Sequence, residues 1–145
     1  MCSLMQGLHW TARPALAVAL LCLAPLVQAG DDSQRLSTMS ESELEAGMRS
    51  GVQVVLQRVP IQMEDQSILV GAEYEPNTRV ATYHYVQPRA VDPQALRIQL
   101  TAKNCATPNT RAMLSRGISF RHLYTAGKRL YDVTVTSNDC GNARS

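Results

Sequence analysis

An apolar segment near the N-terminus determines how much of this chain can take part in a folded domain. The run ALAVALLCLAPLVQAG follows the early positive charge of Arg13 and ends in the letters VQA, the small-x-small pattern that signal peptidase cleaves. We therefore expect residues 1–29 to be a signal peptide that is cleaved after Ala29. The run is shorter than the ~20 residues that span a bilayer, and Pro25 interrupts it. We expect no stable membrane anchor after cleavage.

A lipid could also hold such a protein at a membrane. Leu21 precedes Cys22 at the position where a bacterial lipoprotein signal needs a small residue. We therefore do not expect an acyl chain on Cys22. The predicted localisation is periplasmic or secreted, and the sequence does not distinguish these two destinations.

Cleavage would leave two cysteines, Cys105 and Cys140, in an oxidising compartment. An even pair of cysteines in a small exported domain typically forms a disulfide, so we predict a bond between them. The chain-entropy model gives a bond that closes a loop of roughly 35 residues a stabilisation of about 4 kcal/mol. The alternative is a catalytic thiol at Cys105, which would need a base and no available cysteine partner.

The composition excludes several classes of protein. The chain is 45% hydrophobic and 18% charged, which indicates one ordinary globular domain rather than a disordered chain. Arg13 is the only charged residue in the predicted signal peptide, so cleavage lowers the net charge from +2 to about +1. A nearly neutral domain lacks the charge that binding to nucleic acid or to an anionic membrane requires. We expect neither partner.

The first part of the predicted mature chain divides into a leader and a helix. Residues 30–39 are polar and are predicted to be a flexible leader before a single domain over residues 40–145. Ser40 and Glu43 have the spacing of a capping box, which marks the start of a helix. Apolar residues then recur at helical spacing until Pro60; they are Leu44, Met48, Val52, Val55, Leu56 and Val59.

Two glycines, Gly47 and Gly51, lie within this predicted helix. Each weakens a helix by roughly 1 kcal/mol relative to alanine, so we expect another element to approach closely there. The stripe that contains Met48, Val52 and Val55 is predicted to pack in the core, and the alternative is that it lines a groove for a partner.

Alternating patterns predict two pairs of strands. Residues 67–73 and 78–86 form the first pair, with a turn at Glu75-Pro76-Asn77. The second pair starts at Ile118, turns at residues 125–128 and returns to Val135. Between these pairs, the start signals Asp92-Pro93 and Thr107-Pro108 predict two helices, with Cys105 in the joint between them and a left-handed Gly117 at the end of the second.

The predicted order is αββααββ. Hairpins pair locally and a sheet needs a covered face, so we predict an α+β fold with one disulfide. The predicted architecture is a two-layer sandwich, in which a four-stranded, mainly antiparallel sheet carries the helices on one face.

The segment from Leu100 to Asn142 resembles a known family. Its NCATPNTRAMLSRGISF core and its C-terminal NDCG are similar to the C-terminal half of the small α/β class of type II secretion pilotins. The matching positions are Cys105, Pro108, Met113, Leu114, Gly117, Ile118, Cys140 and Gly141. The resemblance implies a disulfide and binding to an outer-membrane secretin. Such pilotins are lipoproteins, and this chain departs from them in lacking a lipid-attachment cysteine. The pattern also resembles small exported proteins associated with virulence.

These observations favour an exported, non-enzymatic binding or adaptor domain that assists secretion or envelope assembly, with a secretin or another envelope protein as partner. The alternative is a secreted, quorum-sensing-regulated virulence factor or a periplasmic protein that neutralises a toxin. We predict no enzyme, cofactor or metal site, because the candidate groups form no catalytic or metal-ligating pattern. These groups are His84, His122, Asp132 and Asp139.

Tyrosines on the predicted strands are a candidate partner surface, because tyrosine combines apolar area with a polar tip. They are Tyr83, Tyr85, Tyr124 and Tyr131. The alternative is that they pack around the core, in which case the stripe of Met48, Val52 and Val55 is the predicted surface.

Overall fold

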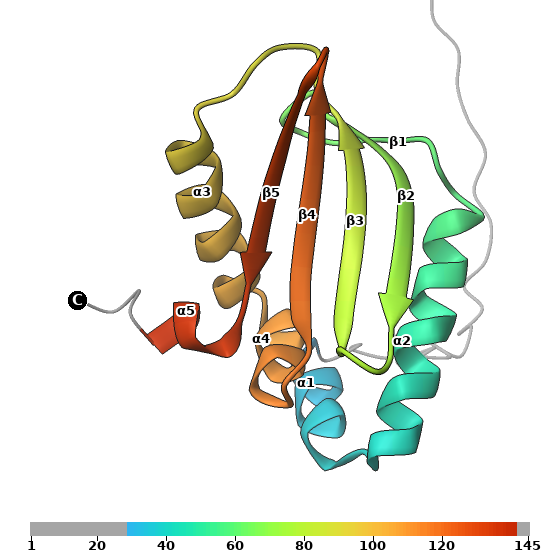
Figure 1. The fold of residues 1–145 in the computed structure, drawn as a ribbon. Helices are drawn as coiled ribbons and strands as arrows, with labels where there is room; N and C mark the ends of the chain where they lie inside the picture. The colour runs from blue at the N-terminus through green and yellow to red at the C-terminus, as the bar shows by residue number, and fades with distance from the viewer. Residues whose placement is uncertain (1–28, 142–145) are drawn as a thin grey trace, which may run out of the picture.

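The structure is a computed structural model that describes residues 29–141, with side chains described from residue 32 onward. The predicted signal peptide up to residue 28, including Cys22, lies outside these residues. The elements are α1 (Ala29–Thr38), α2 (Glu41–Leu56), β1 (Ile61–Gln62), β2 (Ile68–Glu75), β3 (Val80–Val86), α3 (Pro93–Ala106), α4 (Pro108–Ser115), β4 (Ser119–Ala126), β5 (Arg129–Val135) and α5 (Ser137–Gly141). Figure 1 shows α2 beside β2, α3 beside β5, and α1 with α4 at one end of the sheet.

The α+β class is confirmed, but the description of the sheet needs correction. The sheet has five strands in the order β1-β2-β3-β4-β5. β3 and β4 are parallel, whereas the other neighbours are antiparallel. The parallel pair arises because α3 and α4 return the chain to the end of the sheet where β3 began, as a crossover connection does. β1 was not predicted because two residues are too short to show a period.

Helices cover one face of the sheet, and no helix of residues 29–141 covers the other, which is called the open face below. Side chains of Tyr85, Phe120 and Val135 belong to the same buried cluster as Leu44 of α2 and Leu100 of α3. Alternate residues on the same strands point to the opposite face, as the pleat of a strand requires. These open-face residues include Glu73, His84, Val86, Arg121, Leu130 and Asp132. The prediction that helices cover one face agrees with this arrangement.

The predicted helix starts and turns are present. Ser40 and Glu43 form a complete capping box at α2, in which the Glu43 carboxylate accepts from the Ser40 backbone N–H at 2.8 Å. Asp92 caps α3 by accepting from the Gln94 N–H at 3.0 Å. Gly117 has φ +82°, which is a left-handed conformation that favours glycine after a helix.

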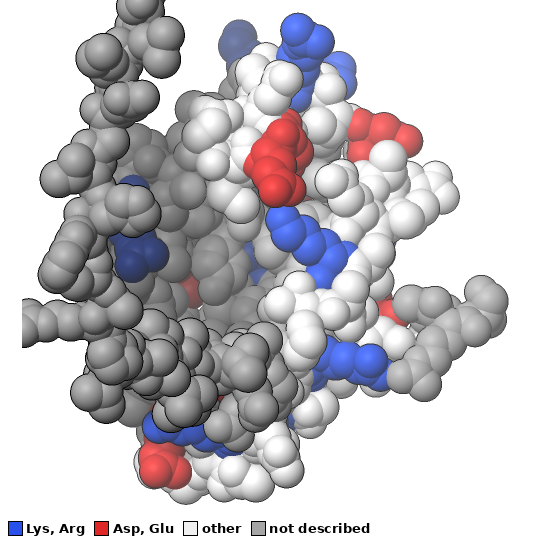
Figure 2. Space-filling model, turned by 180° about the vertical axis from the view of Figure 1, so that it is seen from behind, with Lys and Arg blue, Asp and Glu red and all other residues white. Residues whose placement is uncertain are grey.

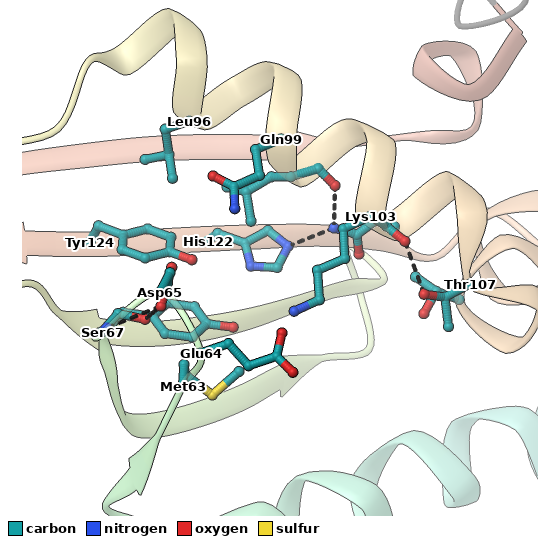
Figure 3. A pocket seen from close by; sticks show the side chains of 14 residues that line it. Met63, Glu64, Asp65, Ser67, Leu96, Gln99, Lys103, Thr107, His122 and Tyr124 are labelled. Atoms are coloured by element: carbon teal, nitrogen blue, oxygen red, sulfur yellow. Dashed lines mark hydrogen bonds between the residues drawn. The ribbon is translucent and has the colours of Figure 1, made fainter.

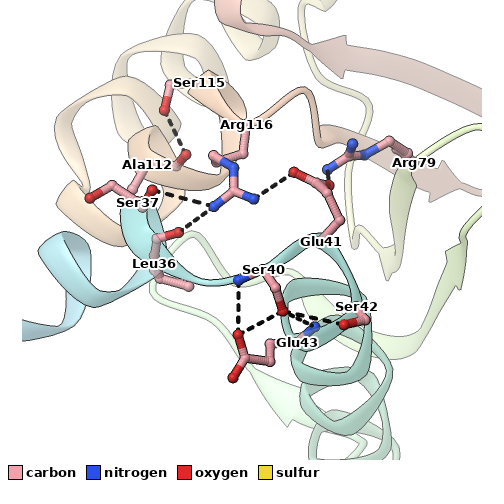
Figure 4. Close-up of polar contacts among 10 residues, drawn as sticks. All are labelled: Leu36, Ser37, Ser40, Glu41, Ser42, Glu43, Arg79, Ala112, Ser115 and Arg116. Atoms are coloured by element: carbon pink, nitrogen blue, oxygen red, sulfur yellow. Dashed lines mark hydrogen bonds and ion pairs between the residues drawn. The ribbon is translucent and has the colours of Figure 1, made fainter.

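Most of residues 30–39, which were predicted to be a flexible leader, lie in the helix α1, which ends at Thr38. Arg116, the residue after α4, donates to the Leu36 carbonyl at 2.9 Å, and the same guanidinium pairs with Glu41 at the start of α2 (Figure 4). Glu41 also pairs with Arg79 at 2.7 Å. The bond from Arg116 satisfies a free carbonyl at the end of α1 from 80 positions away in the chain, which local composition cannot reveal.

The predicted disulfide between Cys105 and Cys140 is confirmed. It joins the end of α3 to α5, a short helix that the sequence patterns did not predict. The Asp139 carboxylate accepts from the backbone N–H and the hydroxyl of Thr136, both at 2.8 Å. Because α4, β4 and β5 lie between Cys105 and Cys140 in the chain, the disulfide closes a loop that contains these three elements.

Candidate functional site

An apolar groove lies where α1, α2 and α4 meet at one end of the sheet, and its volume is about 410 Å³. Three methionines line it from different elements, namely Met39 before α2, Met48 of α2 and Met113 of α4. Val52 and Val55 of α2 extend the same apolar wall. The residues that line the groove are therefore mostly apolar.

The sequence of α2 explains one wall of the groove. Met48 and Val52 lie one helical turn apart on the face that contacts the sheet, so they are 8% and 7% exposed. Gly47 and Gly51 have the same spacing and also line the groove. A Cβ added at either glycine would meet no atom within 4 Å. The predicted approach of another element to these glycines is therefore wrong within the residues described, and the bare backbone leaves space.

This groove has the chemistry of a surface that receives a helix. Methionine is flexible and polarisable, so methionine-rich surfaces adapt to different apolar partners. Amphipathic helices bind by inserting apolar side chains into such grooves. The floor also contains Tyr83, and burial raises the pKa of its hydroxyl, which therefore stays protonated at neutral pH.

Three of the four tyrosines do not form the predicted partner surface. Tyr85, Tyr124 and Tyr131 are each 8% exposed or less, because strand alternation places them on the helix-covered face. The rings of Tyr85 and Tyr124 stack with centroids 4.4 Å apart. Only Tyr83 reaches the groove, beside Met48, Val52 and Val55. The alternative prediction, packing around the core, describes the other three.

The four candidate acid-base residues lie at separate places. Asp132 pairs with Arg121 on the open face, and the hydrogen bond from Arg121 holds the pKa of Asp132 below its usual value. Asp139 caps α5, and the Thr136 N–H lowers the pKa of its carboxyl. His84 lies 3.4 Å from Glu73, whereas His122 is buried beside Asn104. Within residues 32–141, no group of three His, Cys, Asp or Glu side chains is placed to hold a metal ion.

The sequence pattern located only part of the groove. Met48, Val52 and Val55 were predicted as a surface, but Met39, Met113 and the two glycines were not. The signal that could have identified the glycines is their spacing, since Gly47 and Gly51 share one face of α2 with its apolar stripe.

Figure 2 shows basic and acidic side chains interspersed on the described part of one side, without a large patch of either sign. In the part of the chain that was searched, no helix is both long and apolar enough to cross a membrane.

Comparisons with known proteins show the fold but not a sequence family. No protein-family model matches the chain, and the search of curated proteins also finds no match. The solved pilotin EpsS of the type 2 secretion system of Vibrio vulnificus superposes with a TM-score of 0.58 at 18% identity, over 77% of this chain and 96% of EpsS.

Two other solved structures are similar. The type II secretion system pilotin AspS from Vibrio cholerae has a TM-score of 0.55 at 16% identity and covers 77% of this chain and 97% of its own length. A Pseudomonas aeruginosa protein that is proposed to be secreted has a TM-score of 0.56 at 19% identity, over 69% of this chain and 95% of its own. The chain described here therefore has a pilotin-like fold.

Proposed function

We propose that this protein is an exported, non-enzymatic adaptor that binds an amphipathic helix of an envelope protein in the groove between α1, α2 and α4. The observation that carries the proposal is the apolar groove itself, with its methionine walls and the bare backbone at Gly47 and Gly51. The pilotin-like fold supports a role in a secretion system, and a secretin is the partner that such a role suggests.

The glycines define how the partner would bind. Without side chains at positions 47 and 51, the backbone of a partner helix can approach α2 closely, as small residues allow between packed helices. Apolar side chains of the partner would then contact Met48, Val52 and Met113, with Tyr83 beneath them. Each well-packed anchor of this kind typically contributes about 1–3 kcal/mol to binding.

The test uses a variant in which a new side chain fills the groove while the fold is kept. In Gly51→Leu the new side chain would occupy the space in which the partner helix binds, while leucine is also the better helix former. Ser50→Leu is the matched control, because Ser50 is the neighbouring exposed residue of α2 and does not line the groove. Both variants and the unmodified protein are used to capture proteins from the envelope fraction of the host, and mass spectrometry identifies them.

The proposal predicts one envelope protein that the unmodified protein and Ser50→Leu capture equally. Its recovery with Gly51→Leu should fall at least tenfold, which corresponds to about 1.4 kcal/mol of binding energy. Melting temperatures of the variants show whether each is folded. Equal capture by a folded Gly51→Leu variant would contradict the groove as the binding site.

The same experiment addresses the alternative role as a secreted virulence-associated or toxin-neutralising protein. An adaptor in envelope assembly would be retained with the envelope fraction and would capture a component of that fraction. Recovery of the protein mainly from the culture medium, together with capture of a toxin, would favour the alternative.

A further inference from the structure

A second cavity, separate from the groove, lies between α3 and the loop that joins β1 to β2 (Figure 3). Its volume is about 340 Å³, which lies within the size range of pockets that hold small ligands. No residue that lines the groove also lines this cavity. An inference about its ligand is therefore independent of the adaptor function.

The floor of the cavity is flat and aromatic. The stacked rings of Tyr85 and Tyr124 form one part of it, and the His122 ring lies 5.9 Å from that of Tyr85 at an interplanar angle of 25°. Leu96 and Leu100 of α3 add an apolar wall. Such a floor suits an aromatic or aliphatic side chain, which can lie against the rings.

His122 supplies a hydrogen-bond donor that has no partner among residues 32–141. The Asn104 amide nitrogen donates to the Leu100 carbonyl at 2.8 Å, which fixes the orientation of the amide. The same nitrogen lies 3.2 Å from His122 Nε2. Because an amide nitrogen can only donate, Nε2 must accept, and the proton of the neutral imidazole is on Nδ1. His122 is 6% exposed, and its Nδ1 is buried without a partner.

A buried donor without an acceptor is unfavourable, and native structures rarely leave one unless another molecule satisfies it. In Figure 3 the imidazole of His122 is drawn on the cavity side of its strand, facing the space between Tyr124 and Lys103. Burial and then the charge of Lys103 lower the pKa of His122 to about 4. The ring is therefore neutral at physiological pH, as the tautomer requires.

Oppositely charged side chains lie on the two walls at the opening of the cavity, which is called the mouth below. Lys103 of α3 and Glu64 of the β1–β2 loop extend toward each other in Figure 3, yet the ion pairs found among the described side chains include neither. Asp65, beside Glu64, is already engaged, since it accepts from the backbone N–H of Ser67 at 3.0 Å and also from the Ser67 hydroxyl. The mouth thus has the Lys103 ammonium on one wall and the Glu64 carboxylate on the facing wall, beside the Asp65 carboxylate that Ser67 binds.

We propose that this cavity binds a compact zwitterion of the α-amino-acid class with an apolar side chain. The carboxylate of the ligand accepts from His122 Nδ1–H and lies beside the ammonium of Lys103. The ammonium of the ligand faces the carboxylate of Glu64. The side chain lies on the floor that Tyr85 and Tyr124 form. Each charge of the ligand thereby meets an opposite charge, and the unpartnered donor gains an acceptor.

The test titrates L-phenylalanine into the purified, isotope-labelled protein and follows the NMR signals of His122, Tyr85 and Tyr124. Two further probes each lack one charge. L-Phenylalaninamide has no carboxylate, and N-acetyl-L-phenylalanine has no ammonium. We expect saturable shifts with L-phenylalanine and an affinity at least tenfold weaker for each of the other two. Equal affinity for all three compounds, or no saturable shift up to about 10 mM L-phenylalanine, would overturn the proposal.

Substitutions of Lys103 and Glu64 test which charged group of the ligand each side chain contacts. Lys103→Gln should weaken the binding of L-phenylalanine at least tenfold and remove the preference for L-phenylalanine over its amide. Glu64→Gln should remove the preference for L-phenylalanine over the acetylated compound. Both positions are exposed, so the variants should fold normally. Lys128→Gln, at the exposed turn between β4 and β5, is the control and should leave all affinities unchanged. A Lys103→Gln variant that still prefers the free acid to the amide would contradict the assigned role of Lys103.

Discussion

Acidification from pH 6.5 to pH 4 should destabilise this protein through one side chain, His122. Burial, followed by the nearby charge of Lys103, lowers the pKa of His122 from 6.5 to about 4. Protonation would also place a second donor against the Asn104 amide, which is fixed by its bond to Leu100. The folded protein therefore resists protonation of this ring, whereas the unfolded chain accepts a proton near pH 6.5.

The magnitude follows from the difference between the two pKa values. Between pH 6.5 and pH 4, the unfolded chain binds more protons at His122 than the folded protein does, so the free energy of unfolding falls as the pH falls. A tenfold difference in proton affinity corresponds to about 1.4 kcal/mol. The drop from 6.5 to about 4 therefore amounts to a loss of about 3 kcal/mol. Below pH 4 this contribution stays constant, because both states are protonated.

Urea denaturation at a series of pH values between 7 and 4 measures this slope. His122→Gln replaces the ring with a neutral amide and should flatten the slope, although the cavity floor changes shape. His84→Gln is the matched control, because the His84 side chain is 41% exposed and lies on the open face. It should keep the slope of the unmodified protein. A free energy of unfolding that stays constant from pH 7 to pH 4.5 in the unmodified protein would show that burial does not lower the pKa of His122.

Three further predictions concern stability. Replacing Cys105 and Cys140 together by serine should lower the free energy of unfolding by about 4 kcal/mol, since the bond spans 35 residues; a loss below about 1 kcal/mol in urea denaturation would contradict this estimate. Gly51→Ala should raise the melting temperature, because alanine stabilises an unobstructed helix position by about 1 kcal/mol; a lower melting temperature would show an unrecognised contact. Asp139→Asn should cost about 1 kcal/mol at pH 7 and less as the solution is acidified, because the Thr136 N–H holds the pKa of Asp139 below 3.8 and its contribution is lost as the pH falls through that lower value; a loss that does not diminish on acidification would contradict this.

Local signals in the sequence predicted most helices and strands because their physical causes are local. The capping box at Ser40, the Asp92-Pro93 start and the left-handed Gly117 each depend on neighbouring residues only. The pairing of Cys105 with Cys140 also followed from the sequence, since only these two cysteines follow the predicted signal peptide.

The features that the sequence did not reveal depend on contacts between distant residues. α1 is held by Arg116, which is separated from it in the chain by three helices and three strands. The parallel pairing of β3 and β4 depends on the path of α3 and α4, which strand patterns do not encode. The tyrosines alternated as expected, but their alternation alone could not show that the helices cover the face on which they lie.

The candidate site shows the same limit. The spacing in α2 predicted a stripe of Met48, Val52 and Val55, but a groove also needs a second wall, which Met113 supplies from α4. Gly47 and Gly51 were expected to be approached closely by another element, but no element of the described chain fills the space beside them.

Photo-crosslinking in living cells can show whether a partner helix binds in the groove. A photoreactive phenylalanine analogue is placed at Val55, which lines the groove, and at Ile98, a 63% exposed residue of α3 outside it. We predict that irradiation links the protein with the analogue at Val55 to one envelope protein and that the analogue at Ile98 gives no such product. A crosslink to the same envelope protein from Ile98 but not from Val55 would contradict the account.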